Sequence, residues 1–267
     1  MVTPHPYRCR LLLFLRYPQS GQTKTRLIPA IGAAGAAALQ RCMAKYLVQH
    51  LQHPNWVLQV HFSGASRAAM QALLGPELAY YPQTEGALGD RLWYGLAQAS
   101  QHGLQANELE KARSLSEQAP ALPVIRTIAI GADCPELSSD HIQQAFNILQ
   151  DQDLVIGPAS DGGYYLIGLR QVFQGAANTS MQSLFQDIDW STSRVFQQTM
   201  QKAQQLGLSH SQLETLSDID RPEDLAILER LRHRIESDFI KTDWQDSLQK
   251  DSQQTLADKA ALQQTAI

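Results

Sequence analysis

Patterns typical of β-strands alternate with patterns typical of helices along most of this chain, and this alternation limits its fold more than any other feature. Residues 8–15 (RCRLLLFL) form a continuous apolar run, as expected for a strand that is buried on both faces. A helical pattern follows at residues 35–51, and a second buried strand is expected at residues 124–131 (VIRTIAIG). We therefore predict an α/β, Rossmann-like fold, with a mixed, mostly parallel sheet and helices on both faces.

The other predicted elements keep this alternation. Strands are expected at residues 56–62, 78–81, 153–157, 164–169 and 210–216, and helices at residues 65–74, 88–100, 138–149, 193–206 and 222–236. We expect one domain over residues 1–236, with a polar surface insertion at residues 101–123. Residues 237–267 are rich in Gln, Asp, Lys and Ser, which predicts a tail that is part helical or disordered.

Charge and cysteine content restrict the class of protein. The formal net charge is -4, which argues against a nucleic-acid-binding protein but allows a local basic pocket for one phosphorylated ligand. The three cysteines form no CxxC pair, and a sparse, odd number is typical of a reducing cytoplasm. The apolar run at residues 27–39 is too short to span a membrane, which takes roughly 20 apolar residues. We expect a cytoplasmic protein with no membrane span; the oligomeric state stays open.

The first candidate site is the loop that follows the first strand. Arg16, Lys24 and Arg26 supply positive charge there, and Gly21 would let backbone N–H groups approach a phosphate. Loops at the carboxyl ends of central strands are where open α/β sheets bind ligands. The spacing is not that of a Walker loop, and a solvated basic loop is the plain structural alternative.

Two further segments offer carboxylates at strand ends. Asp133 follows the buried strand in IAIGADCPEL, where it could hold Mg²⁺ or Mn²⁺ against a diphosphate, although a simple turn would also explain it. In GPASDGGYYLIGL, Asp161-Gly162-Gly163 predicts a hairpin turn. The functional interpretation is that Asp161 faces the cleft and the two glycines let a ligand approach the backbone.

The segment LSDIDRPEDL at residues 216–225 contains a fourth candidate. Asp220 and Glu223 have the spacing of a capping box, which makes Asp220 a structural residue in this prediction. Asp218 would then be free to bind a metal ion. Two weaker candidates are Arg91, in the first turn of a helix, and Trp190, just before another helix.

Taken in order along the chain, these motifs resemble one known family. The cationic loop, GADCPEL, DGGYYLIGL, WST and DIDRPEDL together are similar to the GT-A-type transferases known as radical-SAM/selenodomain-associated transferase 1, or arsenosugar-biosynthesis glycosyltransferases. The resemblance covers residues 12–228, apart from the insertion. More distantly the chain resembles the 2-phospho-lactate and molybdenum-cofactor guanylyltransferases of the nucleotide-diphospho-sugar transferase superfamily.

The resemblance implies a nucleotide bound at the carboxyl edge of the sheet. It places Arg16, Gly21, Lys24, Arg26 and Arg91 on the nucleotide and Asp133 on the metal ion. Pro135 stands where a second metal-binding Asp would be, so we expect the second ligand to be Asp218. The sugar or acceptor would be held by Asp161, Gly162, Gly163, Trp190 and Thr192, with Asp161 and Lys24 as the catalytic residues.

Three functions remain open from the sequence. The first is a metal-dependent glycosyltransferase that uses a nucleotide sugar and a small-molecule acceptor. The second is a nucleotidyltransferase that releases pyrophosphate from an NTP, which the dense positive charge of the first loop favours. The third is a non-catalytic nucleotide-binding protein, which gains support if Asp133 and Asp218 lie far apart.

Overall fold

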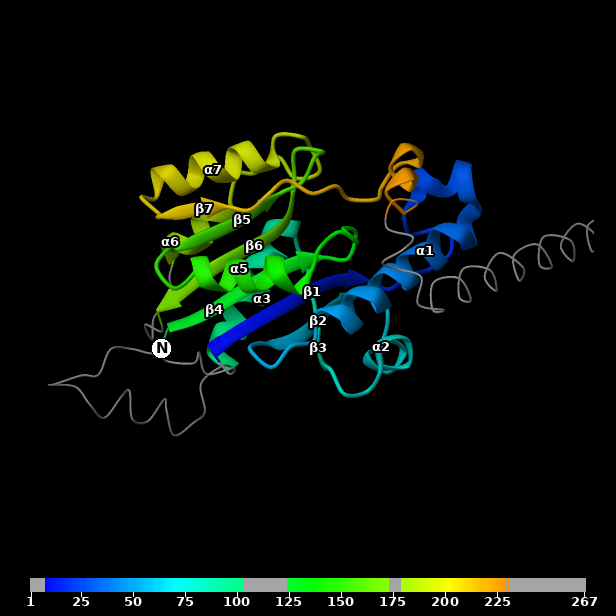
Figure 1. Ribbon diagram of the computed structural model, residues 1–267, viewed down its shortest axis with the longest axis horizontal. Coiled ribbons are helices and arrows are strands. Elements are labelled where there is room, and N and C mark those ends of the chain that lie inside the picture. The colour runs from blue at the N-terminus through cyan, green and yellow to red at the C-terminus, as the bar shows by residue number, and fades with distance from the viewer. Residues whose placement is uncertain (1–7, 103–123, 173–178, 229, 231–267) are drawn as a thin grey trace, which may run out of the picture.

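The computed structural model describes residues 8–102, 124–172, 179–228 and 230 (Figure 1). Its centre is a seven-stranded sheet in the order β3-β2-β1-β4-β6-β5-β7. The strands are β1 (Cys9–Arg16), β2 (Val57–Ser63), β3 (Ala79–Pro82), β4 (Val124–Gly131), β5 (Leu154–Pro158), β6 (Tyr164–Val172) and β7 (His210–Gln212). Every predicted strand is present, although the last is shorter than expected and β6 is longer.

The sheet is mixed and mostly parallel, as predicted. β1 runs parallel to both β2 and β4, and the pairs β2–β3 and β5–β7 are also parallel. Only β6 is reversed, and it pairs antiparallel to β4 and β5. The carboxyl ends of β1, β2, β4 and β5 therefore meet at one edge of the sheet, together with the turn that joins β5 to β6.

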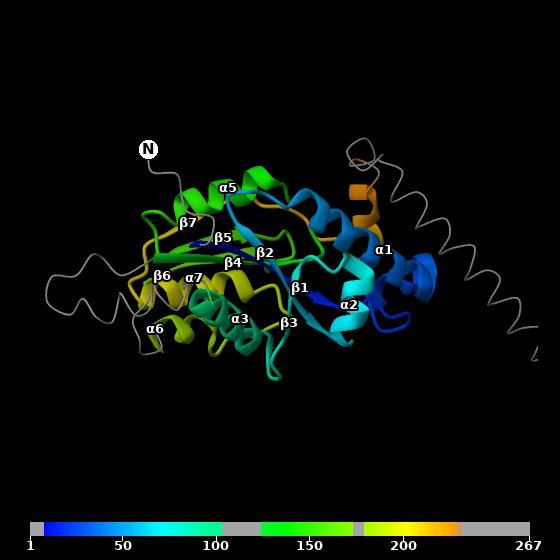
Figure 2. The same cartoon turned by 90° about the horizontal axis from the view of Figure 1, so that it is seen from below.

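Helices cover both faces of the sheet (Figure 2). One face carries α1 (Ile28–His50), α2 (Arg67–Leu74) and α5 (Ser139–Ile148), and the other carries α3 (Leu88–His102), α6 (Thr179–Gln182) and α7 (Val195–Gln205). Alternation along β1 explains this, since Leu11 and Leu13 point into the first core and Leu12 into the second. Both faces of a central strand are thus buried, as its continuous apolar run indicates.

A smaller core joins the start of α1 to the last described segment. Leu27, Leu39 and Met43 pack there against Ile219 and Ile227, so residues 216–228 cross from β7 to α1 (Figure 1). The helix predicted at residues 222–236 is present only as the 3-10 turn Pro222–Asp224 and helical residues 225–228. The rest of that prediction lies outside the described residues, as do the tail and nearly all of the insertion at residues 101–123.

Helix α1 starts earlier than its sequence pattern indicates. Pro29 fits the first turn of the helix, and Gly32 has a positive φ of 71° that separates this turn from the longer helix after it. Residues 25–50 are also long and apolar enough to cross a membrane, judged by length and composition alone. Of the relevant window, 56% is buried inside the fold, as in the core helix of a globular domain. The short helix α6 was not predicted.

Candidate functional site

A cleft opens at the carboxyl ends of β1 and β4. It lies where the alternating strand pattern and the parallel pairing together predict a ligand site. The side chains that line it come from β1, the loop after it, α1, the end of β4 and the crossing segment: Phe14, Leu15, Arg16, Gln22, Thr23, Lys24, Gln40, Ala132, Asp133 and Asp220. The cleft therefore contains three of the candidate residues outright, namely Arg16, Lys24 and Asp133.

The loop after β1 is shaped by two residues with positive φ. Gly21 has a φ of 77°, and Lys24 has a φ of 46° in the left-handed region that non-glycine residues rarely adopt. Inside the loop, the Gln19 N–H donates to Thr23 Oγ1 at 3.0 Å. Fully buried Leu27 anchors the end of the loop in the small core beside α1. The chain thus bends sharply and turns Lys24 back toward the sheet.

Lys24 points into the cleft and bonds two oxygens. Its Nζ lies 2.8 Å from Oδ1 of Asp133 and also donates to the carbonyl oxygen of Ile219. The Lys24 side chain is only 4% exposed, whereas that of Asp133 is 49% exposed. The Ile219 N–H donates to the Asp133 carbonyl at 2.9 Å, so the crossing segment lies directly against the end of β4. The sequence predicted that these residues lie at one edge of the sheet, and in the structure Lys24 contacts both Asp133 and Ile219.

Arg26 is also paired, in a way that corrects the sequence prediction. Its guanidinium donates to the carboxylate of Asp220, which makes Asp220 a partner of the cationic loop. The predicted capping box of Asp220 with Glu223 is wrong. Asp224 performs the capping instead, since its Oδ2 accepts from the N–H groups of Asp220 and Arg221 at 3.0 and 2.7 Å. Because the Asp220 carboxylate pairs with Arg26 at the surface, it does not cap the start of the helix.

Three carboxylates influence one another beside the cleft. Burial, together with the negative charges of Asp133 and Asp161, raises the pKa of Asp218 to about 7, although the Lys24 ammonium acts to lower it. The charges of Asp133, Asp161 and Lys24 therefore all reach Asp218. Asp161 occupies the tip of the β5–β6 hairpin, where its Oδ1 accepts from the Gly163 N–H at 2.8 Å. The predicted hairpin is confirmed.

The chemistry of these donors fits a magnesium-type ion that is shared with a ligand. Within the described part of the chain, no group of three or more His, Cys, Asp or Glu side chains is arranged to hold a metal ion. Mg²⁺, however, is commonly held by one or two carboxylates together with substrate phosphates. Asp133 and Asp218 carry hard oxygen donors of that kind, and the negative charge of Asp133 raises the pKa of Asp218.

The hairpin turn packs tightly against the segment before α7. Gly162 has a φ of 90°, and a Cβ atom there would lie 2.2 Å from the carbonyl oxygen of Ser193. The Phe196 N–H donates to the Gly162 carbonyl at 2.9 Å, so the two segments also share a backbone hydrogen bond. We call this contact of residues 161–163 with residues 193–196 the glycine junction. It carries Asp161 on a backbone that is held from two sides.

Trp190 and Thr192 contact residues of the segments around them. A Cβ atom on Gly89 would lie 2.8 Å from the Trp190 ring, and Trp190 meets Tyr164 edge-on with ring centroids 6.4 Å apart. The Thr192 hydroxyl donates to the carbonyl of Asp189 at 2.7 Å. Trp190 therefore packs between the start of α3 and the start of β6. Arg91 donates to the Gly86 carbonyl at 2.9 Å and does not line the cleft.

Sequence reasoning missed Gln40 and Thr23 in the cleft. Gln40 lies in the middle of α1, is 5% exposed, and donates to the carbonyl of Ala132 at 3.3 Å. A polar side chain on the buried face of a helix is the one signal that could have revealed it, since such groups need a partner inside the fold. Gln40 ties α1 to the end of β4, one residue before Asp133.

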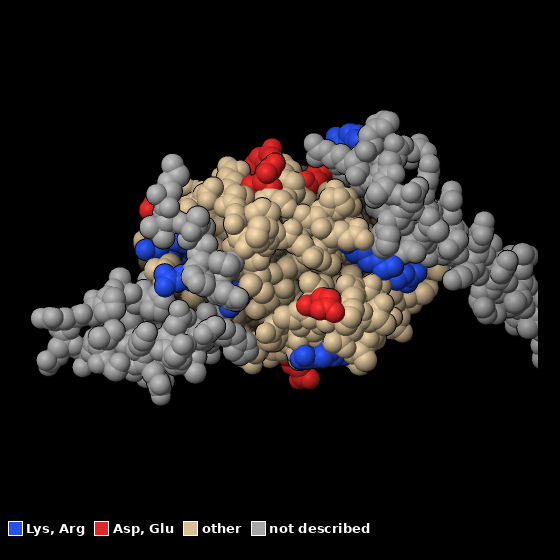
Figure 3. Space-filling model, turned by 60° about the horizontal axis from the view of Figure 1, so that its bottom comes forward, with Lys and Arg blue, Asp and Glu red and all other residues tan. Residues whose placement is uncertain are grey.

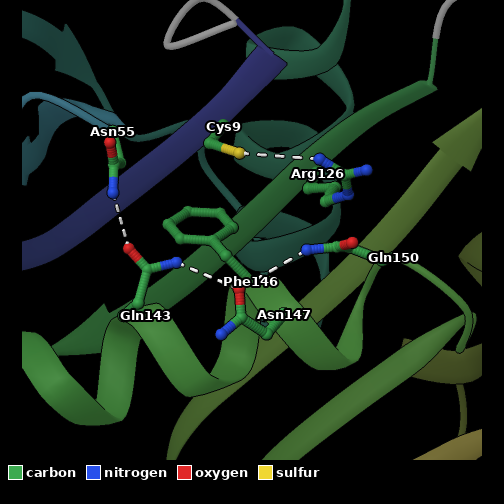
Figure 4. Close-up of a pocket in the computed structure, with 7 residues that line it drawn as sticks. All are labelled: Cys9, Asn55, Arg126, Gln143, Phe146, Asn147 and Gln150. Carbon is green, nitrogen blue, oxygen red and sulfur yellow. Dashed lines mark hydrogen bonds between the residues drawn. The ribbon is translucent and has the colours of Figure 1, made fainter. Parts of the chain in front are cut away.

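A second, much smaller pocket lies at the opposite edge of the sheet (Figure 4). Its amide side chains bond one another, with Asn55 donating to Gln143 at 2.7 Å and Gln143 donating to Asn147 at 3.1 Å. Arg126 donates to the carbonyl of Leu149 at 3.1 Å. These polar groups satisfy each other, so the pocket is explained by the packing of α5. All three cysteines, including Cys9 in this pocket, are buried free thiols.

Charged side chains are sparse on the face of the molecule drawn in Figure 3. This face is mostly uncharged among the described residues, with small separate groups of Lys and Arg or Asp and Glu residues. The formal net charge of the whole chain is -4.

Comparison with known proteins gives a family and a fold. Residues 46–192, more than half of the chain, match the model of the family described as "Uncharacterized protein conserved in bacteria (DUF2064)". No curated protein matches the sequence. A crystal structure from Desulfovibrio desulfuricans G20, provisionally assigned as a nucleotide-diphospho-sugar transferase, is 27% identical and has a TM-score of 0.71. The alignment covers 91% of this chain and 97% of that one, so the two share their fold.

Two other solved structures align more loosely. The 4-diphosphocytidyl-2C-methyl-D-erythritol synthase of Anaerococcus prevotii is 8% identical over 85% of this chain and 97% of that one, with a TM-score of 0.47. Glucosyl-3-phosphoglycerate synthase of Mycobacterium tuberculosis, solved with Mn²⁺ and UDP, is 11% identical over 85% of this chain and 77% of that one, with a TM-score of 0.43.

Proposed function

The chain belongs to the DUF2064 family, and we propose that it is a metal-dependent glycosyltransferase that uses a nucleotide-activated sugar as its donor. The 27% identity to a protein assigned as a nucleotide-diphospho-sugar transferase, over nearly the full length of both chains, supports a transferase of this class. The motif order further supports the branch known as radical-SAM/selenodomain-associated transferase 1. We also propose that it acts in the cytoplasm.

One observation carries this proposal: the Lys24 ammonium and the Asp133 carboxylate meet in a cleft at the carboxyl edge of the sheet, and their charges also act on Asp218. Lys24 contacts Asp133 at 2.8 Å, and Asp218 lies close enough to both to feel their charges. A diphosphate is recognised by cations, and a divalent metal between it and carboxylates removes their repulsion. A purely structural cluster would have no need of an open cleft beside it.

Each group has a role in this proposal. Asp133 and Asp218 would hold Mg²⁺ or Mn²⁺, which when bound supplies positive charge to a departing nucleoside diphosphate. Lys24 would donate to the same diphosphate, and Arg16 and Arg26 would add positive charge at the mouth of the cleft. Gly21, where nothing lies within 4 Å of the position of a Cβ atom, would let phosphate oxygens reach backbone N–H groups.

The acceptor would lie on the hairpin side. Asp161 is exposed at the turn and is the candidate base that takes the proton of an acceptor hydroxyl. Gly162 and Gly163 keep the backbone open beside it, and Trp190 and Thr192 belong to the adjoining segment. The bond that breaks joins the sugar to the diphosphate, and the bond that forms joins the sugar to the acceptor oxygen.

The nucleotidyltransferase alternative keeps one specific argument. The loop after β1 carries three cations within eleven residues, which is ample charge for a triphosphate. In that reaction the nucleotide is transferred and pyrophosphate leaves. The same carboxylates would hold the metal ion, so the released product separates the two reactions.

Product analysis tests the proposal directly. The protein is incubated with nucleotide sugars or NTPs, Mg²⁺ or Mn²⁺, and a panel of small hydroxyl-bearing acceptors. Release of nucleoside diphosphate supports the glycosyltransferase, and release of pyrophosphate supports the nucleotidyltransferase. Release of neither, with nucleotide still bound, would identify a non-catalytic binding protein.

The variant Asp133→Asn sharpens this test. It keeps the shape of the side chain but removes the charge, so nucleotide binding should lose its dependence on metal while the circular dichroism spectrum stays unchanged. Calorimetry with and without EDTA measures this. Equal nucleotide affinity of the unchanged protein in both buffers would refute the metal-binding role.

A further inference from the structure

We propose that the Lys24 ammonium is the resident counter-ion of the carboxylate pair and must leave Asp133 before a divalent metal binds there. The inference rests on the proposed function, because it assumes that Asp133 and Asp218 hold the metal ion. It adds which group neutralises the carboxylates of that site when neither metal nor nucleotide is bound. Lys24 would then have two partners in turn, first Asp133 and later a phosphate.

The contacts of Lys24 place a cation where a metal ion would find its ligands. The Nζ atom bonds a carboxylate oxygen of Asp133 and the carbonyl oxygen of Ile219. Both are hard oxygen donors of the kind that bind Mg²⁺ and Mn²⁺. Because the Lys24 side chain is 4% exposed, this ammonium is an enclosed part of the site and not a passing surface contact.

The position of Lys24 also explains how the carboxylates tolerate one another. Asp218 feels unfavourable charge from Asp133 and Asp161 and favourable charge from Lys24. Carboxylates that repel one another are stabilised by a cation close by. When no metal ion is present, Lys24 is the described side chain that supplies this charge to Asp133 by direct contact.

The backbone at Lys24 is suited to a change of partner. Its φ of 46° is unusual for a residue with a side chain, and strained residues of this kind cluster at switch regions and ligand clamps. Gly21, three residues before it, has open space around its α-carbon. A small adjustment of this bend would move the ammonium away from Asp133.

Competition of this kind makes metal and nucleotide binding cooperative. Metal alone must displace Lys24 and leave an ammonium without its anion, so it binds weakly. A nucleotide diphosphate gives Lys24 a new anionic partner, and the metal then binds without that penalty. By linkage, each ligand should raise the affinity of the other by the same factor.

The test is a Mn²⁺ titration without nucleotide, in which the electron paramagnetic resonance signal of free Mn²⁺ measures how much of the metal ion is bound. Lys24→Met keeps the length of the side chain and removes its charge, and it should bind Mn²⁺ at least tenfold more tightly than the unchanged protein. Arg26→Met removes one charge from the same loop without freeing Asp133, so it should change Mn²⁺ affinity by less than threefold. Lys24→Gln provides a second neutral variant should the first unfold.

The outcomes separate this inference from the proposed function. If Lys24→Met and Lys24→Gln are folded and bind Mn²⁺ no more tightly than the unchanged protein, the inference is overturned, whatever the enzyme releases. If they bind Mn²⁺ more tightly while no nucleoside diphosphate is ever released, the inference stands and the proposed glycosyltransferase falls. If no protein binds Mn²⁺ even with nucleotide, the metal site and this inference fall together.

Discussion

The two segments that carry candidate site residues, the loop after β1 and the β5–β6 hairpin, are held in opposite ways. On the loop after β1, long charged side chains make the connections: Lys24 reaches Asp133, and Arg26 reaches Asp220. At the glycine junction, backbone meets backbone, and the Gly162 α-carbon has no room for a side chain beside Ser193. The first kind of contact can exchange one anion for another, whereas the second fixes the chain in one conformation.

This difference indicates which side responds to a ligand. A diphosphate brings oxygens that compete for the same ammonium and guanidinium groups, so the loop side can reorganise without unfolding. The hairpin side presents Asp161 from a turn that is already held by the Phe196 hydrogen bond. Under the proposed function, the donor nucleotide would reorganise the loop after β1, while the hairpin that carries Asp161 would keep its conformation.

The largest effect is expected where the glycine junction is broken. In Gly162→Ala the new Cβ would lie 2.2 Å from the Ser193 carbonyl oxygen, in a backbone conformation with a φ of 90°. Clash and backbone strain together should lower the free energy of unfolding by about 3–5 kcal/mol. Urea unfolding of the metal-free protein measures the change.

Gly21→Ala is the matched control for that variant. Gly21 also has a positive φ, 77°, but nothing lies within 4 Å of the position of its Cβ. The substitution should cost only the backbone term, about 1 kcal/mol. Equal losses for the two variants would mean that close packing at residues 161–163 contributes nothing, and the contrast between the two sides would disappear.

The next effect concerns the charge of Asp218. Burial and neighbouring carboxylates raise the pKa of Asp218 to about 7 in the folded protein, against an ordinary value of 3.8. The folded state therefore holds this proton more tightly than the unfolded chain. Stability that is complete below pH 3.8 is lost as the pH rises toward 7, and it stays lost above that value.

Asp218→Asn should remove this loss. In EDTA the variant and the unchanged protein should be equally stable near pH 4, and the variant should be more stable at pH 8 by on the order of 2–3 kcal/mol. Parallel urea titrations at the two pH values measure the difference. If Asp218→Asn is no more stable than the unchanged protein at pH 8, nearby positive charge already offsets the charge of Asp218. Unfavourable electrostatics near the loop would then have to come from other residues.

The sequence predicted the elements and the residues of this site better than the pairs they form. A buried strand that ends at Gly131 necessarily delivers Asp133 to the carboxyl edge, because strand direction and sheet order are set by local pattern and crossover rules. The partner of Asp133 is Lys24, 109 positions away, and no local spacing encodes that contact. Likewise, the local capping spacing of Asp220 was overridden by Arg26, which only the crossing of residues 216–228 to α1 brings near.

The smallest effect is expected for the exposed ion pair between Arg26, in the loop after β1, and Asp220. In the ion pair of Arg26 with Asp220 the side chains are 60% and 43% exposed, so water and salt screen the attraction. Arg26→Ala should lower the free energy of unfolding by less than about 1 kcal/mol, and added salt should reduce even that difference. Urea unfolding at low and high ionic strength measures both. A loss of more than about 2 kcal/mol, insensitive to salt, would mean that Arg26 holds the loop as firmly as the glycine junction holds the hairpin. The loop would then be preset as well, and a ligand could not exchange its partners at low cost.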